Sequence, residues 1–178
     1  MTRPSDHRAG GMRAASSAII SPCGTYRYRL ERDGPGEGAT AIIMVNLSTA
    51  DATEDDATIR KLKGFGGRYG WGRLIVGNLF AYRATDVRAL ATAIDPIGPD
   101  NGYRLAEIFL SVERAIFAWG PTGKLPKRLR DQWRDTDKLC RAMHLTPMSI
   151  GAPAKDGHPC HPLMLPYDRD LQPWTPPA

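Results

Sequence analysis

Two short apolar stretches decide the fold: residues 39–45 (Ala-Thr-Ala-Ile-Ile-Met-Val) and residues 74–80 (Leu-Ile-Val-Gly-Asn-Leu-Phe). Their length and β-branched content are typical of strands that are buried on both faces of a parallel sheet. We expect strands over residues 39–45 and 74–77, the second of which leads into Asn78. Parallel neighbours need a crossover connection, and a helix is expected between them over residues 57–68.

The same patterns predict the rest of the domain. Alternating polar and apolar residues indicate an N-terminal edge strand over 26–32, and apolar runs predict strands over 114–119 and 147–150. Further helices are expected over residues 86–94, 100–111 and 125–144, the last being the longest. The sequence thus predicts an α/β, three-layer sandwich with a central, mainly parallel sheet of about four strands plus the edge strand.

The two ends of the chain are expected to lie outside this sandwich. Residues 1–20 are interpreted as a flexible extension, and residues 21–178 as a single α/β domain. The proline-rich tail from Pro166 is expected to cover part of the surface.

Composition limits the classes of protein that fit. Of 178 residues, 42% are hydrophobic, which argues against disorder, and no run of 18 apolar residues predicts a membrane span. Three cysteines cannot all pair and form no CxxC motif, so a reducing, cytoplasmic setting is expected. The 24 basic against 19 acidic residues give a net charge of +5, which permits a nucleotide or nucleic-acid partner.

Ligand sites of parallel sheets lie at the carboxyl ends of the strands. The loop that follows the first buried strand offers an amide, two hydroxyls and three carboxylates, from Asn46, Ser48, Thr49, Asp51, Asp55 and Asp56. The Asn46 amide could orient an attacking water, and the carboxylates of this segment could alternatively bind Mg²⁺. The competing interpretation is structural, with Asp56 capping the following helix.

The loop after the second strand carries Asn78, Phe80, Tyr82 and Arg83. An amide can read the edge of a nucleobase, and an aromatic ring can stack on its face. Alternatively the two aromatic rings pack in the core, which we favour, and Arg83 pairs with Asp86.

Near the C-terminus, His158 and His161 flank Cys160. A zinc site would need further ligands that the sequence does not supply, so no metal is predicted. A histidine that stabilises developing negative charge is the preferred interpretation. The basic stretch 124–141 is interpreted as a solvated helix face, or alternatively as a surface that follows a phosphate backbone.

Several motifs together resemble one family, the bacterial and phage domain of unknown function 1643. They are residues 46–51 (Asn-Leu-Ser-Thr-Ala-Asp), 55–60 (Asp-Asp-Ala-Thr-Ile-Arg), 78–86 (Asn-Leu-Phe-Ala-Tyr-Arg-Ala-Thr-Asp), 118–120 (Ala-Trp-Gly), 155–159 (Lys-Asp-Gly-His-Pro) and 161–163 (His-Pro-Leu). The resemblance extends over about residues 26–174.

More distantly, the order of these motifs is similar to that in the uracil-DNA glycosylase superfamily. That similarity implies that Asn46 holds water, Asn78 reads a base and His161 stabilises the departing base anion. Trp119 lies in the Trp-Gly pair that ends the third strand of that pattern. Leu47 stands where the superfamily has proline.

These observations predict an enzyme that recognises a nucleobase, nucleoside, nucleotide or nucleic acid. The resemblance implies an N-glycosidase-type hydrolase without a cofactor. The alternatives are a non-catalytic nucleotide or nucleic-acid binding protein, and a Mg²⁺-dependent phosphate-ester enzyme that uses Asp51, Asp55 and His161.

Overall fold

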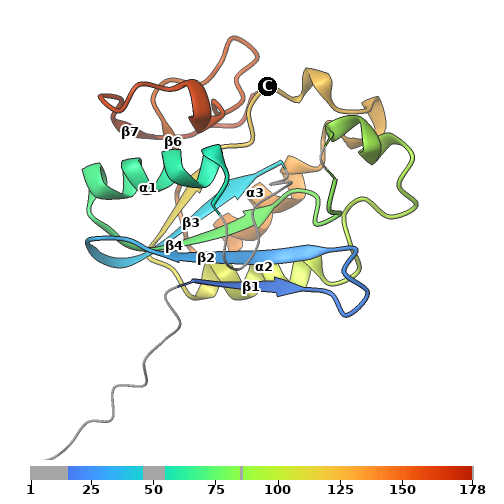
Figure 1. Cartoon of the computed structure of the whole chain (residues 1–178). Helices are drawn as coiled ribbons and strands as arrows, with labels where there is room; N and C mark the ends of the chain where they lie inside the picture. Colours follow the sequence, from blue (N-terminus) through green and yellow to red (C-terminus); the bar gives the residue numbers. More distant parts are fainter. Residues whose placement is uncertain (1–15, 46–54, 85, 178) are drawn as a thin grey trace, which may run out of the picture.

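The computed structural model describes residues 16–45, 55–84 and 86–177, which build an α/β fold around a seven-stranded sheet (Figure 1). The strands are β1 (Ser16–Ile20), β2 (Arg27–Asp33), β3 (Glu37–Met44), β4 (Trp71–Asn78), β5 (Arg114–Phe117), β6 (Pro147–Ile150) and β7 (Leu171–Pro173). The helices are α1 (Ala57–Tyr69), α2 (Asn101–Leu110) and α3 (Trp133–Ala142), with 3₁₀ turns η1 (Val87–Ala91), η2 (Thr122–Lys124), η3 (Lys127–Leu129) and η4 (Pro162–Met164). None of the helices in these residues is long and apolar enough to cross a membrane.

The sheet is mixed, in the order β1-β2-β4-β3-β5-β6-β7. The pairs β4–β3, β3–β5 and β5–β6 are parallel, and β1–β2, β2–β4 and β6–β7 are antiparallel. The α/β class is confirmed, and the four strands expected at the centre, β4, β3, β5 and β6, are parallel neighbours. The sheet as a whole is not mainly parallel, because β1, β2 and β7 add antiparallel pairs. The predicted edge strand, β2, lies inside the sheet because β1 pairs along it.

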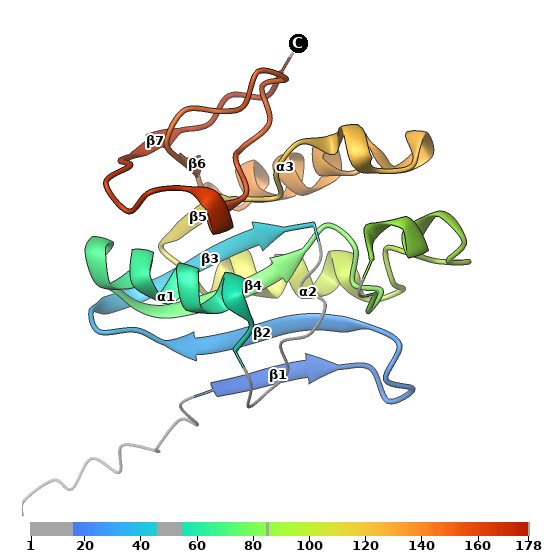
Figure 2. The same ribbon diagram turned by 45° about the horizontal axis from the view of Figure 1, so that its top comes forward.

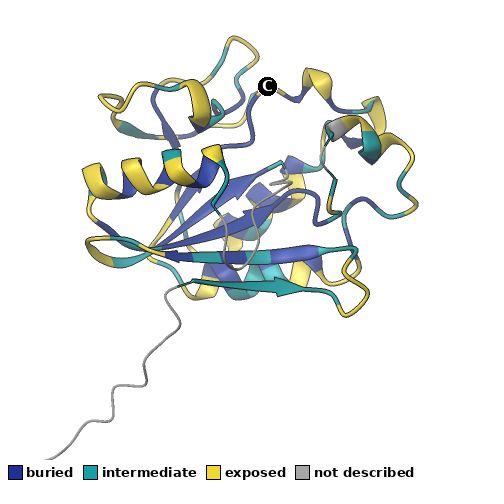
Figure 3. Cartoon of the chain, viewed as in Figure 1, coloured by how far each residue is buried: buried dark blue, intermediate teal, exposed yellow. Residues whose placement is uncertain are grey.

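Alternating side chains of β3 supply both halves of the core. Ala41 and Ile43 pack in the cluster beneath α2 and α3, whereas Ile42 and Met44 pack beneath α1. Figure 2 shows α1 and α2 on opposite sides of the sheet, and Figure 3 shows the central strands buried between them. Burial on both faces explains why this strand is apolar at nearly every position.

Helix α1 begins and ends as its sequence predicts. The Asp56 carboxylate caps it by accepting a hydrogen bond from the Ile59 N–H at 2.8 Å. The helix ends at Gly70, whose φ of 70° is the left-handed conformation that glycine adopts most readily. The prediction that Asp56 is a capping residue is confirmed.

The expected long helix over residues 125–144 was wrong. Only α3 forms a helix there, and two 3₁₀ turns precede it. Pro126 lacks an amide donor, and the Arg130 guanidinium donates to the carbonyl oxygens of Gly123 and Leu125 at 2.9 and 3.0 Å. These bonds stabilise a folded loop instead of the first turns of a helix. The predicted helix over 86–94 is likewise only the short turn η1, capped by Asp86.

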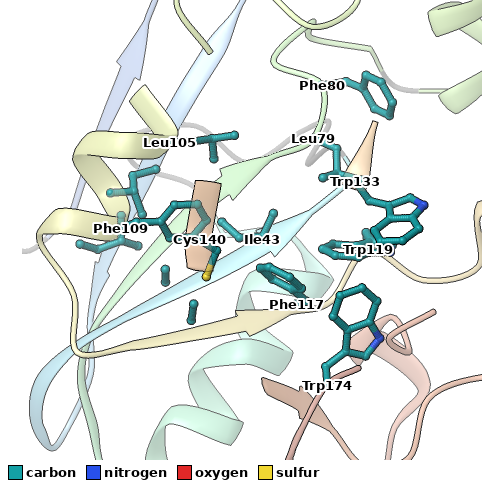
Figure 4. Close-up of a cluster of buried hydrophobic side chains, with 14 of the residues drawn as sticks. Ile43, Leu79, Phe80, Leu105, Phe109, Phe117, Trp119, Trp133, Cys140 and Trp174 are labelled. Carbon is teal, nitrogen blue, oxygen red and sulfur yellow. The ribbon is translucent and has the colours of Figure 1, made fainter. Parts of the chain in front are cut away.

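Both ends of the chain contribute to the sheet, contrary to the sequence-based expectation. Residues 16–20, assigned to a flexible extension, form β1, and the tail forms β7 against β6. Trp174 follows β7, is only 2% exposed, and packs against Phe117, Trp119 and Trp133 (Figure 4). The tail therefore completes the core.

Candidate functional site

The candidate site lies where the parallel strands end. The chain leaving β4 and β5 flanks the end of β3: the Leu79 N–H donates to Met44 O at 2.7 Å, and the Ala118 N–H donates to Ile43 O at 2.8 Å. The segment after β3 starts at this edge. Its predicted site residues, Asn46, Ser48, Thr49 and Asp51, lie outside the described residues.

Asn78 is the last residue of β4 and is only 2% exposed. Strand neighbours Leu74 and Val76 belong to the cluster under α1, so alternation along the strand directs the Asn78 side chain to the α1 face. Its side-chain oxygen is buried and has no hydrogen-bond partner among the described residues. The strand end thus holds a buried carboxamide oxygen that the described residues leave unsatisfied.

Asn101 fixes the backbone at this strand end. Its side-chain amide donates to the carbonyl oxygens of Asn78 and Leu79, at 3.0 and 3.3 Å. Sequence reasoning assigned Asn101 only to the start of a helix. Its contact with the strand end depends on how α2 docks, which no local pattern reports.

His161 lies in the loop before η4, which packs beside α1 (Figure 1). Its Nδ1 accepts a hydrogen bond from the Leu163 N–H at 3.3 Å, so in the neutral ring the proton is on Nε2. Burial lowers the pKa of His161, and the negative charge of Asp56 at the start of α1 partly opposes that shift. His161 and Asn78 therefore both lie on the α1 side of the sheet.

Gly120 positions the loop that carries His161. Its φ is 78°, and its N–H donates to Pro159 O at 3.0 Å. A side chain at this position would place a Cβ atom 3.2 Å from the Cβ of His161, a tight contact. Within the Trp-Gly pair, Gly120 is thus the residue that lies close to His161. Sequence reasoning did not single it out.

Trp119 and Phe80 lie in the core on the other face of the sheet. Phe80 is completely buried and Trp119 is 2% exposed, both in the cluster under α2 and α3. The core interpretation that we favoured for Phe80 is confirmed. Neither ring offers a face to a ligand at the α1 side.

The contacts of His158 indicate that its role is structural. The Trp119 Nε1–H donates to His158 Nδ1 at 3.4 Å, and His158 Nε2 lies 3.1 Å from the Thr122 hydroxyl. Burial lowers the pKa of His158, and burial also raises the pKa of the Cys160 thiol. Within the described parts of the chain, no three His, Cys, Asp or Glu side chains gather as a metal site would require.

Tyr82 and Arg83 lie away from His161, beside the turn between β1 and β2. Tyr82 forms a β-bridge with Tyr26, and Arg83 donates to Gly24 O at 3.2 Å. The alternative interpretation in which Arg83 pairs with Asp86 is wrong, because Asp86 pairs with Arg88 at 2.6 Å.

The basic stretch 124–141 uses many of its cations internally. Arg128 donates to the carbonyl oxygens of Leu90 and Ala91, both at 3.1 Å. Two further ion pairs, Arg134–Asp131 and Arg141–Asp137, lie along α3 and the turn before it. Because these cations already have partners within the protein, the interpretation of this stretch as a surface that follows a phosphate backbone is weakened.

Acidification is expected to destabilise the protein through buried His158 and half-buried His161. Because His158 and His161 have lowered pKa values when folded, the unfolded chain binds protons more readily. The stabilisation is fully present above the ordinary histidine pKa of about 6.5 and is lost as the pH falls through the lower folded values. Urea midpoints at pH 7.5, 6.5 and 5.5 should therefore decrease, and His158→Gln should reduce the dependence. A midpoint that stays constant or rises would contradict this account.

Comparison with known proteins identifies the family but no relative of known function. Neither the curated proteins nor the solved structures yielded a match. The family model described as "Protein of unknown function (DUF1643)" matches residues 27–163. Because this match covers more than half of the chain, the protein belongs to that family.

Proposed function

We propose that the protein is an enzyme that recognises a nucleobase and hydrolyses its bond to a sugar. The observation that carries the proposal is the buried Asn78 side-chain oxygen, which has no partner among the described residues. Leaving such an acceptor unsatisfied costs about 1–3 kcal/mol, which a ligand N–H would offset. A carboxamide presents one acceptor beside two donors, the pattern that pairs with a base edge.

His161 would act on the leaving group. The Leu163 N–H occupies Nδ1, which leaves Nε2–H as a donor, and the lowered pKa favours the neutral ring. A neutral imidazole can stabilise an oxyanion on the departing base by donating this hydrogen bond. Asn78 would thus recognise the base, and His161 would stabilise the negative charge on the base as it departs.

The reaction is the hydrolysis of the bond between the base and the sugar. Water attacks the anomeric carbon of the sugar, and the bond between that carbon and the base nitrogen breaks. The bonding electrons leave with the base, which then takes up one of the water protons. Asn46 is the residue that we assign to orienting the water, on its likeness in sequence to the uracil-DNA glycosylase superfamily. That likeness also supports a glycosylase-like arrangement of the strands.

The substrate class proposed is a nucleobase in a nucleoside, nucleotide or nucleic acid. Stacking on the base is not assigned to Phe80 or Trp119, since both rings are buried in the core. Reaction on a duplex would require flipping the base out, at a cost of a few kcal/mol.

A Mg²⁺-dependent phosphate-ester enzyme is the weaker alternative. Asp55, one of its expected ligands, accepts from Arg32 at 2.6 Å and from Lys63 at 3.1 Å. Burial alone would raise the pKa of Asp55, but these two cations hold it below its usual range. A carboxylate already paired with two cations is poorly placed to bind a metal ion.

A base-release assay tests the proposal. The protein would be incubated with nucleosides, nucleotides and single- and double-stranded DNA and RNA, and free base would be quantified by chromatography. We expect release that EDTA leaves unchanged. Phosphate release that requires Mg²⁺ would support the phosphate-ester alternative. Binding that weakens steeply with salt, without base release, would indicate a binding protein.

A further inference from the structure

A pocket lies at the β1–β2 end of the sheet and is lined by neither Asn78 nor His161. Its volume is about 340 Å³, within the range of about 300–1,000 Å³ typical of small-molecule sites. The side chains that line it include Thr25, Tyr26, Tyr82, Thr92, Ile94 and Asp95. Figures 1 and 2 place the β1–β2 turn and the loop that follows η1 at the same end of the sheet.

We propose that this pocket binds a planar heteroaromatic ring that carries an amino group, such as an amino-substituted nucleobase in a nucleoside. The inference concerns binding alone and is independent of the reaction proposed above.

Two tyrosines form the aromatic part of the pocket. The rings of Tyr26 and Tyr82 meet edge to face with centroids 6.3 Å apart, and Tyr26 stacks on Tyr28 at 6.0 Å. Their backbones are held together, because the Arg27 N–H donates to Ala81 O at 2.8 Å and the Arg83 N–H donates to Thr25 O at 2.9 Å. These backbone hydrogen bonds therefore hold the two rings in place in the protein without ligand, which reduces the entropy lost on binding.

Asp95 gives the pocket its selectivity for a donor group. Its Oδ1 accepts from the amides of Ile97 and Gly98 at 3.1 and 3.0 Å, which orients the carboxylate. Asp95 lines the same pocket as Tyr26, and its other oxygen, Oδ2, is the atom that we assign to accepting a hydrogen bond from the ligand. Burial, and next the negative charge of Asp95, raise the pKa of Tyr26.

Apolar and hydroxyl-bearing side chains both line the pocket. Ile94 is fully exposed, while the hydroxyl-bearing Thr25 and Thr92 line the pocket beside it. An aliphatic side chain next to aromatic rings favours the flat faces of a heterocycle, and the hydroxyls suit its polar edge or an attached sugar. A carboxylate acceptor then distinguishes amino-bearing rings from their keto counterparts.

Calorimetric titration of the full chain with two matched ligand pairs tests the inference. Adenosine and cytidine carry the amino group, whereas inosine and uridine carry a carbonyl oxygen in its place. We expect adenosine and cytidine to bind about tenfold more tightly than their counterparts, from one charge-assisted hydrogen bond. Equal affinity within both pairs, or no binding of adenosine or cytidine, would overturn it.

Variants locate the site. Asp95→Asn retains the Oδ1 acceptor for Ile97 and Gly98, and should remove the preference for the amino-bearing ring. Tyr82→Ala should weaken all binding, whereas the matched control Tyr103→Ala, a change at an exposed tyrosine on α2, should not. If Asn78→Ala abolishes binding while Asp95→Asn and Tyr82→Ala bind like the unmodified protein, the ligand occupies the other site and the inference fails. Thermal unfolding of each variant confirms that it is folded.

Discussion

Replacing Trp174 with alanine is expected to lower the free energy of unfolding by about 3–5 kcal/mol, the usual cost of removing a buried aromatic ring. Trp174 is 2% exposed, contacts three other aromatic rings and donates from Nε1 to Gly157 O at 3.0 Å. The substitution would leave a cavity between the tail and the core cluster of Figure 4, so β7 should also be held less firmly against the core. Urea unfolding followed by circular dichroism measures the change.

The control for Trp174→Ala is Leu110→Ala, at a position on α2 that is 73% exposed. Substitutions of this kind usually change stability by no more than about 0.5 kcal/mol. A loss below about 1 kcal/mol for Trp174→Ala would mean that the tail is not part of the core.

Replacing His161 with alanine is expected to lower the rate of base release by about 10²–10³-fold, the effect typical of removing one donor to a developing oxyanion. The Nε2–H would be lost while the fold remains, because His161 belongs to a loop and its Nδ1 satisfies only one backbone amide. The measurement is single-turnover base release with the substrate found in the assay. Protonation would remove the Nδ1 acceptor of the Leu163 N–H that orients the ring, so the rate should fall as the pH drops below the ordinary histidine range.

His144→Asn is the matched control for His161→Ala. His144 is exposed after α3 with a φ of 60°, a conformation that asparagine tolerates, and it lies outside the proposed site. Its base release should equal that of the unmodified protein. Full activity in His161→Ala would remove His161 from the mechanism.

The elements that the sequence predicted well are those whose signal is local. β3 and β4 are buried on both faces, and their sequences are therefore continuous apolar runs. Helix α1 has both a capping aspartate and a terminal glycine. β1 and β7 are short and lie in segments with serine and proline, so no periodic pattern marks them. Their place in the sheet comes from pairing with β2 and β6, a tertiary effect.

The site could be predicted as an edge of the sheet but not as a set of neighbouring side chains. The end-of-strand rule selected Asn78 and His161, which lie on the same side of the sheet. Phe80 belongs to the opposite cluster because the strand ends at Asn78 and its alternation is not maintained beyond that point. Asn101 and Gly120 were missed, since each contributes through a contact that depends on how distant segments pack.

The central claim, that Asn78 recognises a nucleobase, is tested most directly by thermal unfolding in the presence of free bases, nucleosides and nucleotides. All proteins compared would carry Tyr82→Ala, so that the pocket lined by Tyr26 and Tyr82 does not contribute, and would have Asn78, Asn78→Ala or Asn78→Asp, with the midpoint without ligand showing that each folds. At least one base should raise the midpoint of the protein that retains Asn78, by mass action. This increase should disappear in Asn78→Ala and be reduced in Asn78→Asp, which keeps an acceptor but loses the amide donors. An equal increase in Asn78→Ala, or no increase with any base, nucleoside or nucleotide, would contradict the account.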